Sequence, residues 1–567
     1  MSEDGAGPES QARRHFQAGR FAQALALLDS AIAAEPARAP LWNNRGAALA
    51  AMKRFDDAYQ SFGRALALDP EFAGARANRA HALMALHRPD KAIADYEVLL
   101  SRDPQNTLVR GNLIRAKLQI CDWRGLPELW ERAQGDMRED GPAIPPMAVT
   151  ALMESPAEQL CALRALSAAK YPLQLPPLWQ SERYGHKRIR IAYLSADFHA
   201  HATATLMAGV FEAHDRNRFE IFAISFGRDD ASPMRSRLME AFEHFVPVAP
   251  ASDADIASLL RDKEIDIAID LKGFTDGGRP GILARRPAPV QVNYLGFPAT
   301  MGAPYVDYII ADQTLIPPEQ QTHYSEKIVT LPHSYQPNDR RRQAAAASLS
   351  REGEGLPQSG FVFCCFNSLY KITPEIFDIW MGLLRDVEES ALWLLEDGPA
   401  ATGNLKREAS ARGVNPERLV FAPRMPPPEH LARHRLADLF LDTRPYNAHT
   451  TASDALWMGL PLLTCPGETF ASRVAASLLR TIAMPELVTP SLGAYEEMAR
   501  ELARAPARLA AIKEQLARNR ETSPLFDVAR FTRDLETAYS MMWDRQQRGD
   551  APASFAVEDV TADRGPG

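Results

Sequence analysis

The chain has 567 residues, of which 46% are hydrophobic and 24% charged, and its formal net charge is −8. Domains average roughly 100 to 200 residues, so the length predicts several packing units, and the composition excludes a fibrous or disordered chain. The net negative charge argues against a broad nucleic-acid-binding surface.

The cysteines and the first residues indicate the compartment. The number of cysteines is odd and no CxxC spacing occurs, which favours reduced thiols. The segment MSEDGAGPESQARR lacks an apolar core, and no stretch of about 18 apolar residues follows it, so we expect no secretion signal and no membrane contact. These features predict a cytoplasmic protein. The cysteines are Cys121, Cys161, Cys364, Cys365 and Cys465.

Residues 9–115 contain an internal repeat. Pro36, Pro70 and Pro104 are spaced by 34 residues, and each follows an acidic residue. Small and large side chains keep the same step, namely Ala24, Ala58 and Ala92, and Leu28, Phe62 and Tyr96. This pattern lets antiparallel helices approach closely and resembles the tetratricopeptide repeat, whose concave face binds proteins or peptides. A plain helical bundle with coincidental spacing is the alternative.

The chain changes character twice after the repeats. Residues 116–185 look helical but lose the period, and we expect a helical cap and linker there. Residues 186–337 then alternate short apolar runs with helical segments, which predicts a doubly wound α/β domain. The runs lie at 187–198, 219–225, 264–271, 290–297 and 306–312.

A second α/β domain is expected over residues 361–548. The polar stretch at 338–360 joins the two halves, and residues 549–567 are expected to be a mobile tail. Strand-like runs lie at 361–367, 391–397, 418–423, 438–443 and 461–467. The expected fold class is therefore α/β with an all-α N-terminal part, in which an α-solenoid precedes two Rossmann-like domains.

The segment DTRPYNAHTTASDALWMG is the most informative for chemistry. A strand ends at Asp442, a loop runs to His449, and a helix begins near Thr450. Free N–H groups and the helix dipole favour an anion such as a diphosphate at this end, with hydroxyl donors from Thr450 and Thr451. Ordinary helix capping by these threonines is the alternative. Asp454, one turn later, can accept hydrogen bonds from ribose.

Two other segments carry candidate residues. Lys371, in CCFNSLYKITPE, follows a buried strand and suits the growing charge of a diphosphate leaving group, although a solvated surface lysine is the alternative. In SADFHAHATATLM, His201 follows the first strand and can act as a general base or orient an acceptor hydroxyl. Asp253 and Asp255 spell the DxD of metal-dependent sugar transferases, but ASDADIASLLR is typical of a helix start.

Several long motifs together resemble the O-linked N-acetylglucosamine transferase family. They are HTTASDALWMGLPLLTCPGETFASRVAAS, FNSLYKI, LKGFTDGGRPGILARRPAPVQVNYLGFPATMGAPYVDYIIAD and SPLFDVARFTRDLETAYSMMW. The resemblance covers most of residues 187–545. It implies a GT-B arrangement of two Rossmann-like halves and inverting, metal-independent transfer from UDP-GlcNAc to Ser or Thr of proteins, without a cofactor.

The resemblance also implies roles for individual residues. Lys371 would contact the diphosphate, Asp454 would hold the ribose, and His201 would be the base or an acceptor-site residue. The positions that match the family's diphosphate cradle are His449, Thr450 and Thr451, and those that match its uridine contacts are His430 and Arg433. Ser368 stands where a Gln is expected near the nucleotide, so the donor sugar stays open.

The leading hypothesis is transfer of GlcNAc from UDP-GlcNAc to a protein or peptide held along the concave face of the repeats. A related enzyme that moves glucose, possibly onto Asn, is one alternative. A repeat scaffold that binds nucleotide without reacting is another.

Overall fold

The computed structural model describes residues 7–138, 144–172, 176–346 and 349–559. Parts of the expected cap and linker (139–143 and 173–175) and the end of the expected tail (560–567) lie outside the described residues. The chain divides into two compact units, residues 1–145 with 398–404, and residues 146–397 with 405–567. No helix of the described residues is long and apolar enough to cross a membrane.

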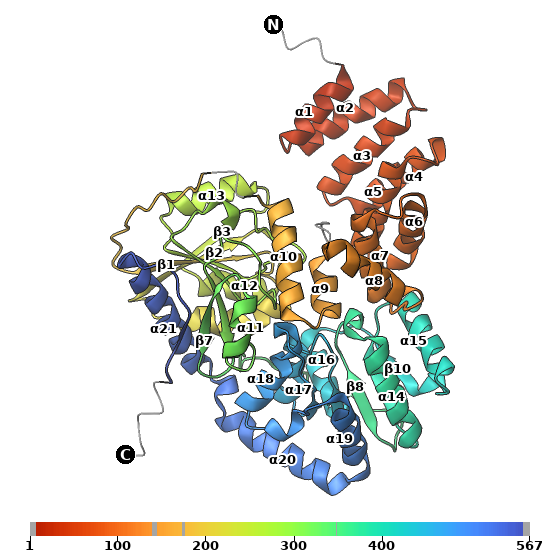
Figure 1. The fold of residues 1–567 in the computed structure, drawn as a ribbon, viewed down its shortest axis with the longest axis vertical. Coiled ribbons are helices and arrows are strands. Elements are labelled where there is room, and N and C mark those ends of the chain that lie inside the picture. The colour runs from red at the N-terminus through yellow and green to blue at the C-terminus, as the bar shows by residue number, and fades with distance from the viewer. Residues whose placement is uncertain (1–6, 139–143, 173–175, 347–348, 560–567) are drawn as a thin grey trace. The chain divides into compact units, whose positions relative to one another are not determined.

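The first unit is a stack of antiparallel helices (Figure 1). Its helices are α1 (Pro8–Gln17), α2 (Phe21–Ala34), α3 (Ala39–Ala51), α4 (Phe55–Leu68), α5 (Ala73–Ala85), α6 (Pro89–Arg102), α7 (Thr107–Gln119) and α8 (Leu126–Arg138). A Cβ atom added at Gly46 would lie 2.5 Å from the Phe62 ring, so α3 and α4 pack closely only because this position has no side chain. Small residues thus face large ones, as the repeat pattern predicts.

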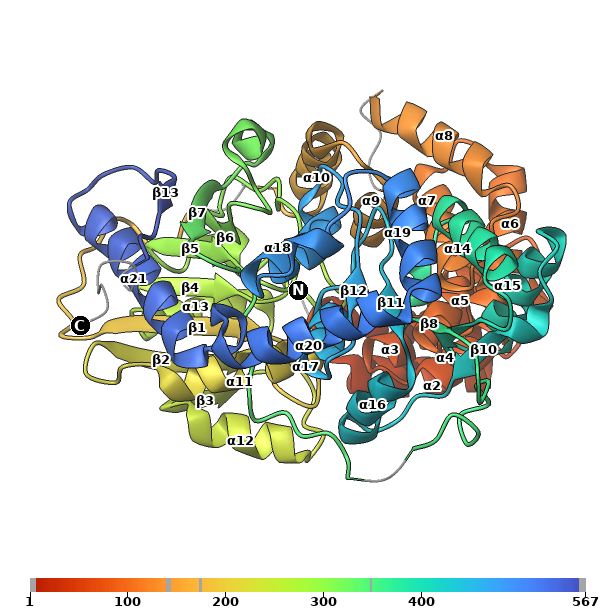
Figure 2. The same cartoon turned by 90° about the horizontal axis from the view of Figure 1, so that it is seen from below.

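The second unit begins with a lobe built on a parallel sheet of eight strands in the order β13-β7-β6-β5-β4-β1-β2-β3, which Figure 2 displays from top to bottom. Ile191 of β1 lies beside Ile221 of β2 and Ile267 of β4, and all three are fully buried. The strands are β1 (Ile189–Ser195), β2 (Phe219–Ser225), β3 (His244–Pro247), β4 (Ile267–Asp270), β5 (Val290–Asn293), β6 (Tyr308–Asp312), β7 (Lys327–Leu331) and β13 (Phe555–Ala556).

Five helices precede or connect these strands. They are α9 (Pro146–Leu152), α10 (Pro156–Lys170), α11 (Ala202–Ala213), α12 (Pro233–Ala241) and α13 (Asp253–Asp262). A Cβ atom at Gly302, whose φ is +59°, would lie 2.5 Å from the backbone N of Arg164, so the loop before β6 packs directly on α10. The second half of the expected linker is therefore part of this lobe.

The DxD segment is a helix cap. Ser252 and Asp255 form a reciprocal capping box at the start of α13, and Asp253 pairs with Arg279 at 2.6 Å. The expectation of a helix start at this point is confirmed.

The second lobe has a parallel sheet of five strands in the order β10-β9-β8-β11-β12. Its strands are β8 (Val362–Cys365), β9 (Ala391–Leu395), β10 (Leu419–Ala422), β11 (Leu439–Leu441) and β12 (Leu462–Leu463). Its helices are α14 (Pro374–Asp386), α16 (Pro427–Arg433), α17 (Thr450–Trp457), α18 (Val474–Thr481), α19 (Leu492–Arg504) and α20 (Pro506–Thr522). Helix α15 (Pro399–Ala411) is divided between the units, since residues 399–404 belong to the first unit and the rest to the second. Each strand lies within a run that the sequence predicts.

The last helix, α21 (Val528–Gln547), returns to the first lobe and lies beside its sheet (Figure 1). His214 Nδ1 lies 2.9 Å from Glu536 Oε1, and the hydroxyls of Tyr193 and Tyr539 lie 3.2 Å apart. All four side chains are buried, so these contacts join α21 firmly to β1 and α11. Strand β13 follows and pairs with β7 at Val329. The fold class expected from the sequence is thus confirmed.

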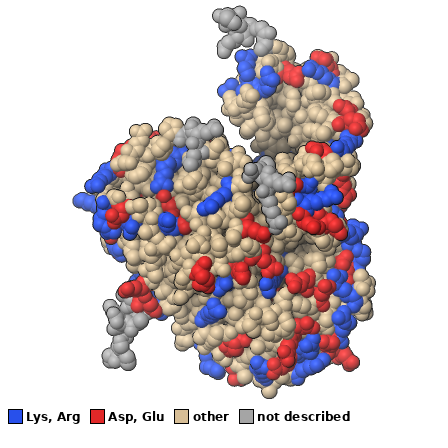
Figure 3. Space-filling model, viewed as in Figure 1, with Lys and Arg blue, Asp and Glu red and all other residues tan. Residues whose placement is uncertain are grey.

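Charged side chains of both signs are interspersed over the face in Figure 3. This mixture agrees with a protein whose 64 basic residues are nearly balanced by 72 acidic ones.

Candidate functional site

The loop between β11 and α17 is the centre of the candidate site. The loop runs from Asp442 to His449, and α17 begins at Thr450. His449 is the N-cap residue of α17, yet its side chain makes no capping hydrogen bond. The first N–H groups of α17 are therefore not capped by this residue, and together with the helix dipole they favour an anion.

Asp442 fixes the shape of this loop. Its carboxylate accepts hydrogen bonds from the backbone N–H of Thr443 at 2.8 Å and of Ala448 at 2.6 Å, and from Thr464 Oγ1 at 2.6 Å. Burial raises the pKa of Asp442 to about 6, while these hydrogen bonds and Lys371 oppose the rise. Because both ends of the loop bind one carboxylate, the loop is shaped before any ligand arrives.

Lys371 lies against the same loop. It ends the 3-10 helix Leu369–Lys371 after β8, and its Nζ donates to the Asn447 carbonyl at 2.8 Å. Nζ also lies 3.9 Å from the centre of the Tyr446 ring. Burial lowers the pKa of Lys371 to about 8, against the opposing effect of Asp442. A desolvated ammonium with one neutral acceptor gains strongly from a nearby phosphate. The alternative of a solvated surface lysine is wrong, because Lys371 is only 8% exposed.

The threonines and His449 complete the edge of the loop. Thr451 Oγ1 donates to Asn367 Oδ1, and Asn367 Nδ2 donates to Thr443 Oγ1 at 2.7 Å, so the buried Asn367 joins α17 to the loop. His449 Nε2 lies 3.2 Å from the Ala471 carbonyl. Burial, reinforced by Lys371, lowers the pKa of His449 well below its usual value, so the ring is neutral at pH 7. Thr450 is half-buried at the first helical position.

Asp454 lies one turn into α17 and is paired with Arg342. The two side chains form an ion pair at 2.5 Å, between Arg342 Nη1 and Asp454 Oδ1. Burial raises the pKa of Asp454, and the guanidinium of Arg342 opposes the rise. Arg342 comes from the segment 338–360, which the sequence indicates only as a linker.

The residues of α16 lie near the end of β8. The His430 ring is half-buried at 5.4 Å from the Phe366 ring, and burial lowers its pKa to about 4, reinforced by Arg433. Arg433 has no exposed surface, donates from Nη1 to the Pro423 carbonyl at 2.8 Å and lies 3.4 Å from Glu354. Of this pair, only His430 presents surface to a ligand.

His201 belongs to a separate cluster on the first lobe, at the N-cap of α11. Its Nδ1 accepts from the Thr203 backbone N–H at 3.2 Å and lies 3.3 Å from Asp197 Oδ2. Lys272 Nζ donates to the same Asp197 oxygen at 2.6 Å. Burial lowers the pKa of His201, and Asp197 opposes this. The hydrogen bond from Thr203 requires Nδ1 without a proton, whereas a hydrogen bond to Asp197 requires a proton on Nδ1. Only the tautomer with its proton on Nδ1 leaves Nε2 free to accept a proton.

The structure thus gathers Lys371, His449, Thr450 and Thr451 around one loop. Asp454 lies one turn along the same helix, and the exposed Ser368 precedes Lys371 on the β8 side. In the described part of the chain, no cluster of three or more His, Cys, Asp or Glu side chains is placed to hold a metal ion.

Sequence reasoning missed the supporting residues of both clusters. These are Arg342, Asn367, Asn447, Asp197 and Lys272. A local signal existed for Asp197, Lys272 and Asn367, which are polar residues two positions after the buried strands β1, β4 and β8.

The model of glycosyl transferase family 41 matches residues 154–346 and 336–535, and a tetratricopeptide repeat model matches residues 39–72.

Two curated relatives have related names. The probable UDP-N-acetylglucosamine–peptide N-acetylglucosaminyltransferase SEC of Arabidopsis thaliana is 40% identical over 379 residues, which cover 66% of this chain and 39% of that protein. The UDP-N-acetylglucosamine–peptide N-acetylglucosaminyltransferase of Caenorhabditis elegans is 29% identical over 488 residues, which cover 66% of this chain and 42% of that protein. The chain therefore spans about two fifths of the length of these relatives.

A solved structure is similar along nearly the whole chain. It is a mutant of the Thermobaculum terrenum O-GlcNAc transferase, with a TM-score of 0.70 and 28% identity, and the match covers 97% of this chain and 100% of the other.

Proposed function

Since the chain belongs to glycosyl transferase family 41, we propose that it transfers N-acetylglucosamine from UDP-N-acetylglucosamine to Ser or Thr hydroxyls of proteins, with inversion and without a metal or cofactor. The observation that carries this proposal is the buried ammonium of Lys371 beside the loop that leads into α17. The names of the relatives and of the similar structure support the choice of donor and acceptor.

The chemistry follows from the charges. The acceptor oxygen forms a bond to C1 of the sugar while the bond from C1 to the β-phosphate oxygen breaks, and the electron pair leaves with UDP. The Lys371 ammonium, the Thr450 hydroxyl and the N–H groups at the start of α17, including that of Thr451, stabilise the charge that grows on this oxygen, while the Thr451 hydroxyl stays bound to Asn367. The hydroxyl proton passes to His201 or to a donor phosphate oxygen.

We assign the nucleoside end of the site to residues of α17, of α16 and of the segment after β8. Asp454 accepts from ribose hydroxyls, and His430 and Ser368, which present surface, contact the uracil side. Arg433 supports the uracil side of the site without reaching the ligand, because its buried guanidinium packs on the rings of Phe366 and Trp393.

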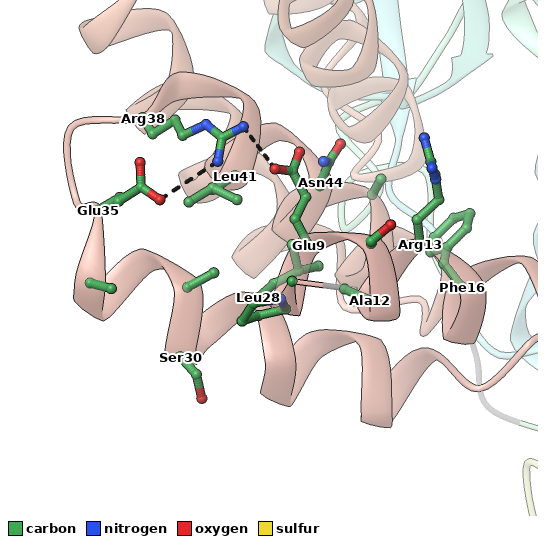
Figure 4. A pocket seen from close by; sticks show the side chains of 16 residues that line it. Glu9, Ala12, Arg13, Phe16, Leu28, Ser30, Glu35, Arg38, Leu41 and Asn44 are labelled. Atoms are coloured by element: carbon green, nitrogen blue, oxygen red, sulfur yellow. Dashed lines mark ion pairs between the residues drawn. The ribbon is translucent and has the colours of Figure 1, made fainter. Parts of the chain in front are cut away.

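We assign acceptor binding to the repeat region. A pocket of about 850 Å³ lies among α1, α2 and α3 (Figure 4). Phe16 and Ala31 give it apolar surface, while Arg38 pairs with Glu9 at 2.8 Å in its wall. Such a surface suits a segment with both apolar and charged side chains. The five cysteines are free thiols, which supports a cytoplasmic location.

The test is a transfer assay with UDP-GlcNAc and UDP-glucose on a peptide pool, with and without a chelator. We expect GlcNAc on Ser or Thr, detected by mass spectrometry, at the same rate in both buffers. A clear preference for glucose, or modification of Asn, would replace the proposed reaction with the related one. UDP binding without transfer or donor hydrolysis on any acceptor would support a nucleotide-binding scaffold.

A further inference from the structure

The segment between the two lobes makes contacts that a simple connection does not need. Gln336 Nε2 donates to Ser453 Oγ on α17, and the Arg342 carbonyl accepts from Trp457 Nε1 on the same helix at 3.2 Å. The ion pair of Arg342 with Asp454 lies between these two contacts along α17. The segment therefore follows the helix whose N-terminus is the proposed diphosphate site.

Arg342 is buried but incompletely paired. Its side chain is 5% exposed, its Nη1 binds Asp454 Oδ1, and its Nε donates to the Asp339 carbonyl at 3.1 Å. Nη2 is buried and has no hydrogen-bond partner among the residues that the structure describes. An unpaired donor on a buried cation is costly, so this nitrogen has strong reason to bind an oxygen acceptor.

Only one oxygen of the Asp454 carboxylate has a hydrogen-bond donor in the described part of the chain. Asp454 Oδ1 faces Arg342, while the described chain offers no hydrogen-bond donor to Oδ2. The side chain of Asp454 keeps 15% of its surface exposed. A free carboxylate oxygen and a free guanidinium nitrogen next to each other match a ligand that both donates and accepts, as a ribose with its hydroxyls does.

The position of Arg342 is itself fixed from the first lobe. Asp339, three residues earlier, pairs with Arg237 of α12 at 2.5 Å, and Arg237 also binds Glu212 of α11 at 2.8 Å. The backbone that carries Arg342 is thus held on both sides, which limits the freedom lost when a ligand binds.

We propose that Arg342 is a binding and positioning residue of the nucleoside site: it holds Asp454 Oδ1 so that Oδ2 accepts one ribose hydroxyl, and its Nη2 donates to a second oxygen of the same ribose. This inference rests on the proposed function, which assigns the ribose to Asp454. It adds to the site a residue from the segment between the lobes.

The test is calorimetric titration of the full chain with UDP and with 2′,3′-dideoxy-UDP, which lacks both ribose hydroxyls. The wild type should bind UDP at least about tenfold more tightly than the dideoxy compound, because hydrogen bonds to charged groups are lost. Arg342→Met should weaken UDP by about tenfold to a hundredfold and leave the dideoxy compound almost unchanged, so that the two ligands bind alike. Arg342→Lys should keep part of the preference.

Arg341→Met is the matched control, because Arg341 is the next residue, is 71% exposed and pairs with Glu212 away from Asp454. It should bind both ligands as the wild type does. If Arg342→Met weakens both ligands equally, or keeps the wild-type preference, the inference is wrong while the proposed function stands. If the wild type does not bind UDP, the proposed function fails and the inference with it. If Arg342→Met does not fold, an unchanged preference in Arg342→Lys refutes the inference.

Discussion

Replacement of Lys371 by Met tests the centre of the proposed mechanism. Met keeps most of the volume of the side chain and removes its charge. In the ligand-free protein the pKa of Lys371 is lowered by burial from 10.5 to about 8. A bound diphosphate would favour the charged form and return the pKa to at least its usual value of about 10.4.

The sign of the pH effect follows from proton binding. Above about pH 8 the free wild-type protein has lost the Lys371 proton, and UDP binding must take it up again. We expect UDP to bind about tenfold more weakly at pH 9 than at pH 7, with uptake of about 0.9 proton per UDP at pH 9 and about 0.1 at pH 7. UDP itself is almost fully ionised over this range, since the last phosphate pKa is about 6.

The free energy of unfolding of the ligand-free protein should rise with pH, whereas the affinity for UDP falls. The unfolded chain holds the lysine proton up to about pH 10.5, whereas the folded protein releases it near pH 8, so unfolding takes up a proton in this window. Between pH 7 and 9.5 the wild type should therefore gain about 2 kcal/mol in free energy of unfolding relative to Lys371→Met.

Calorimetry in buffers of different ionisation enthalpy measures the proton uptake, and urea unfolding measures the stability. Lys371→Met should show neither pH effect and should lower turnover by about 10²-fold or more. Lys327→Met, at an exposed lysine that begins β7, is the control and should behave as the wild type. Equal UDP affinity at pH 7 and 9 in the wild type, without proton uptake, would refute the assignment of Lys371 to the diphosphate.

Three further predictions concern the rest of the site. His201→Ala should impair transfer and keep UDP affinity, measured by turnover and calorimetry; lost affinity would move His201 into the donor site. Arg433→Met should lower the free energy of unfolding by about 3 to 5 kcal/mol in urea, because it leaves Glu354 buried without its ion-pair partner, and a change under about 1 kcal/mol would contradict this. Excess chelator should leave UDP affinity and turnover unchanged, and a loss that magnesium restores would show that a metal takes part.

The sequence predicts those features that depend on the pattern of residues within a short stretch of the chain. The 34-residue step shows the repeats, because each helix pair buries the same small and large positions. The five strands of the second lobe are found because strands buried on both faces are continuous apolar runs. Strands β3, β7 and β13 were missed. Strands β3 and β13 have only half-buried and exposed residues, and β7 mixes buried with half-buried and exposed ones.

Long-range pairing is not visible in local patterns. The return of α21 to the first lobe depends on contacts such as His214 with Glu536, which lie 322 residues apart. Arg342 and Asp454 are likewise 112 residues apart, and the polar stretch around Arg342 has no periodic pattern that would indicate burial. Such contacts follow from the fold and could not have been placed from the sequence of either segment alone.

Contacts between distant parts of the chain hold the groups of the proposed site in place before a ligand binds. Lys371, Asn367 and Arg342 each bind the loop before α17, or α17 itself, from segments that lie earlier in the chain. Each contact fixes a donor or acceptor before the ligand binds, and the ligand therefore meets groups that need little rearrangement. In a buried environment such fixed groups act more strongly on a growing charge than mobile, hydrated ones do. The same burial makes the charged form of Lys371 unfavourable in the ligand-free protein, because a carbonyl is its only hydrogen-bond partner in the described part of the chain. A diphosphate relieves this cost, so affinity for UDP and instability of the empty site have one origin.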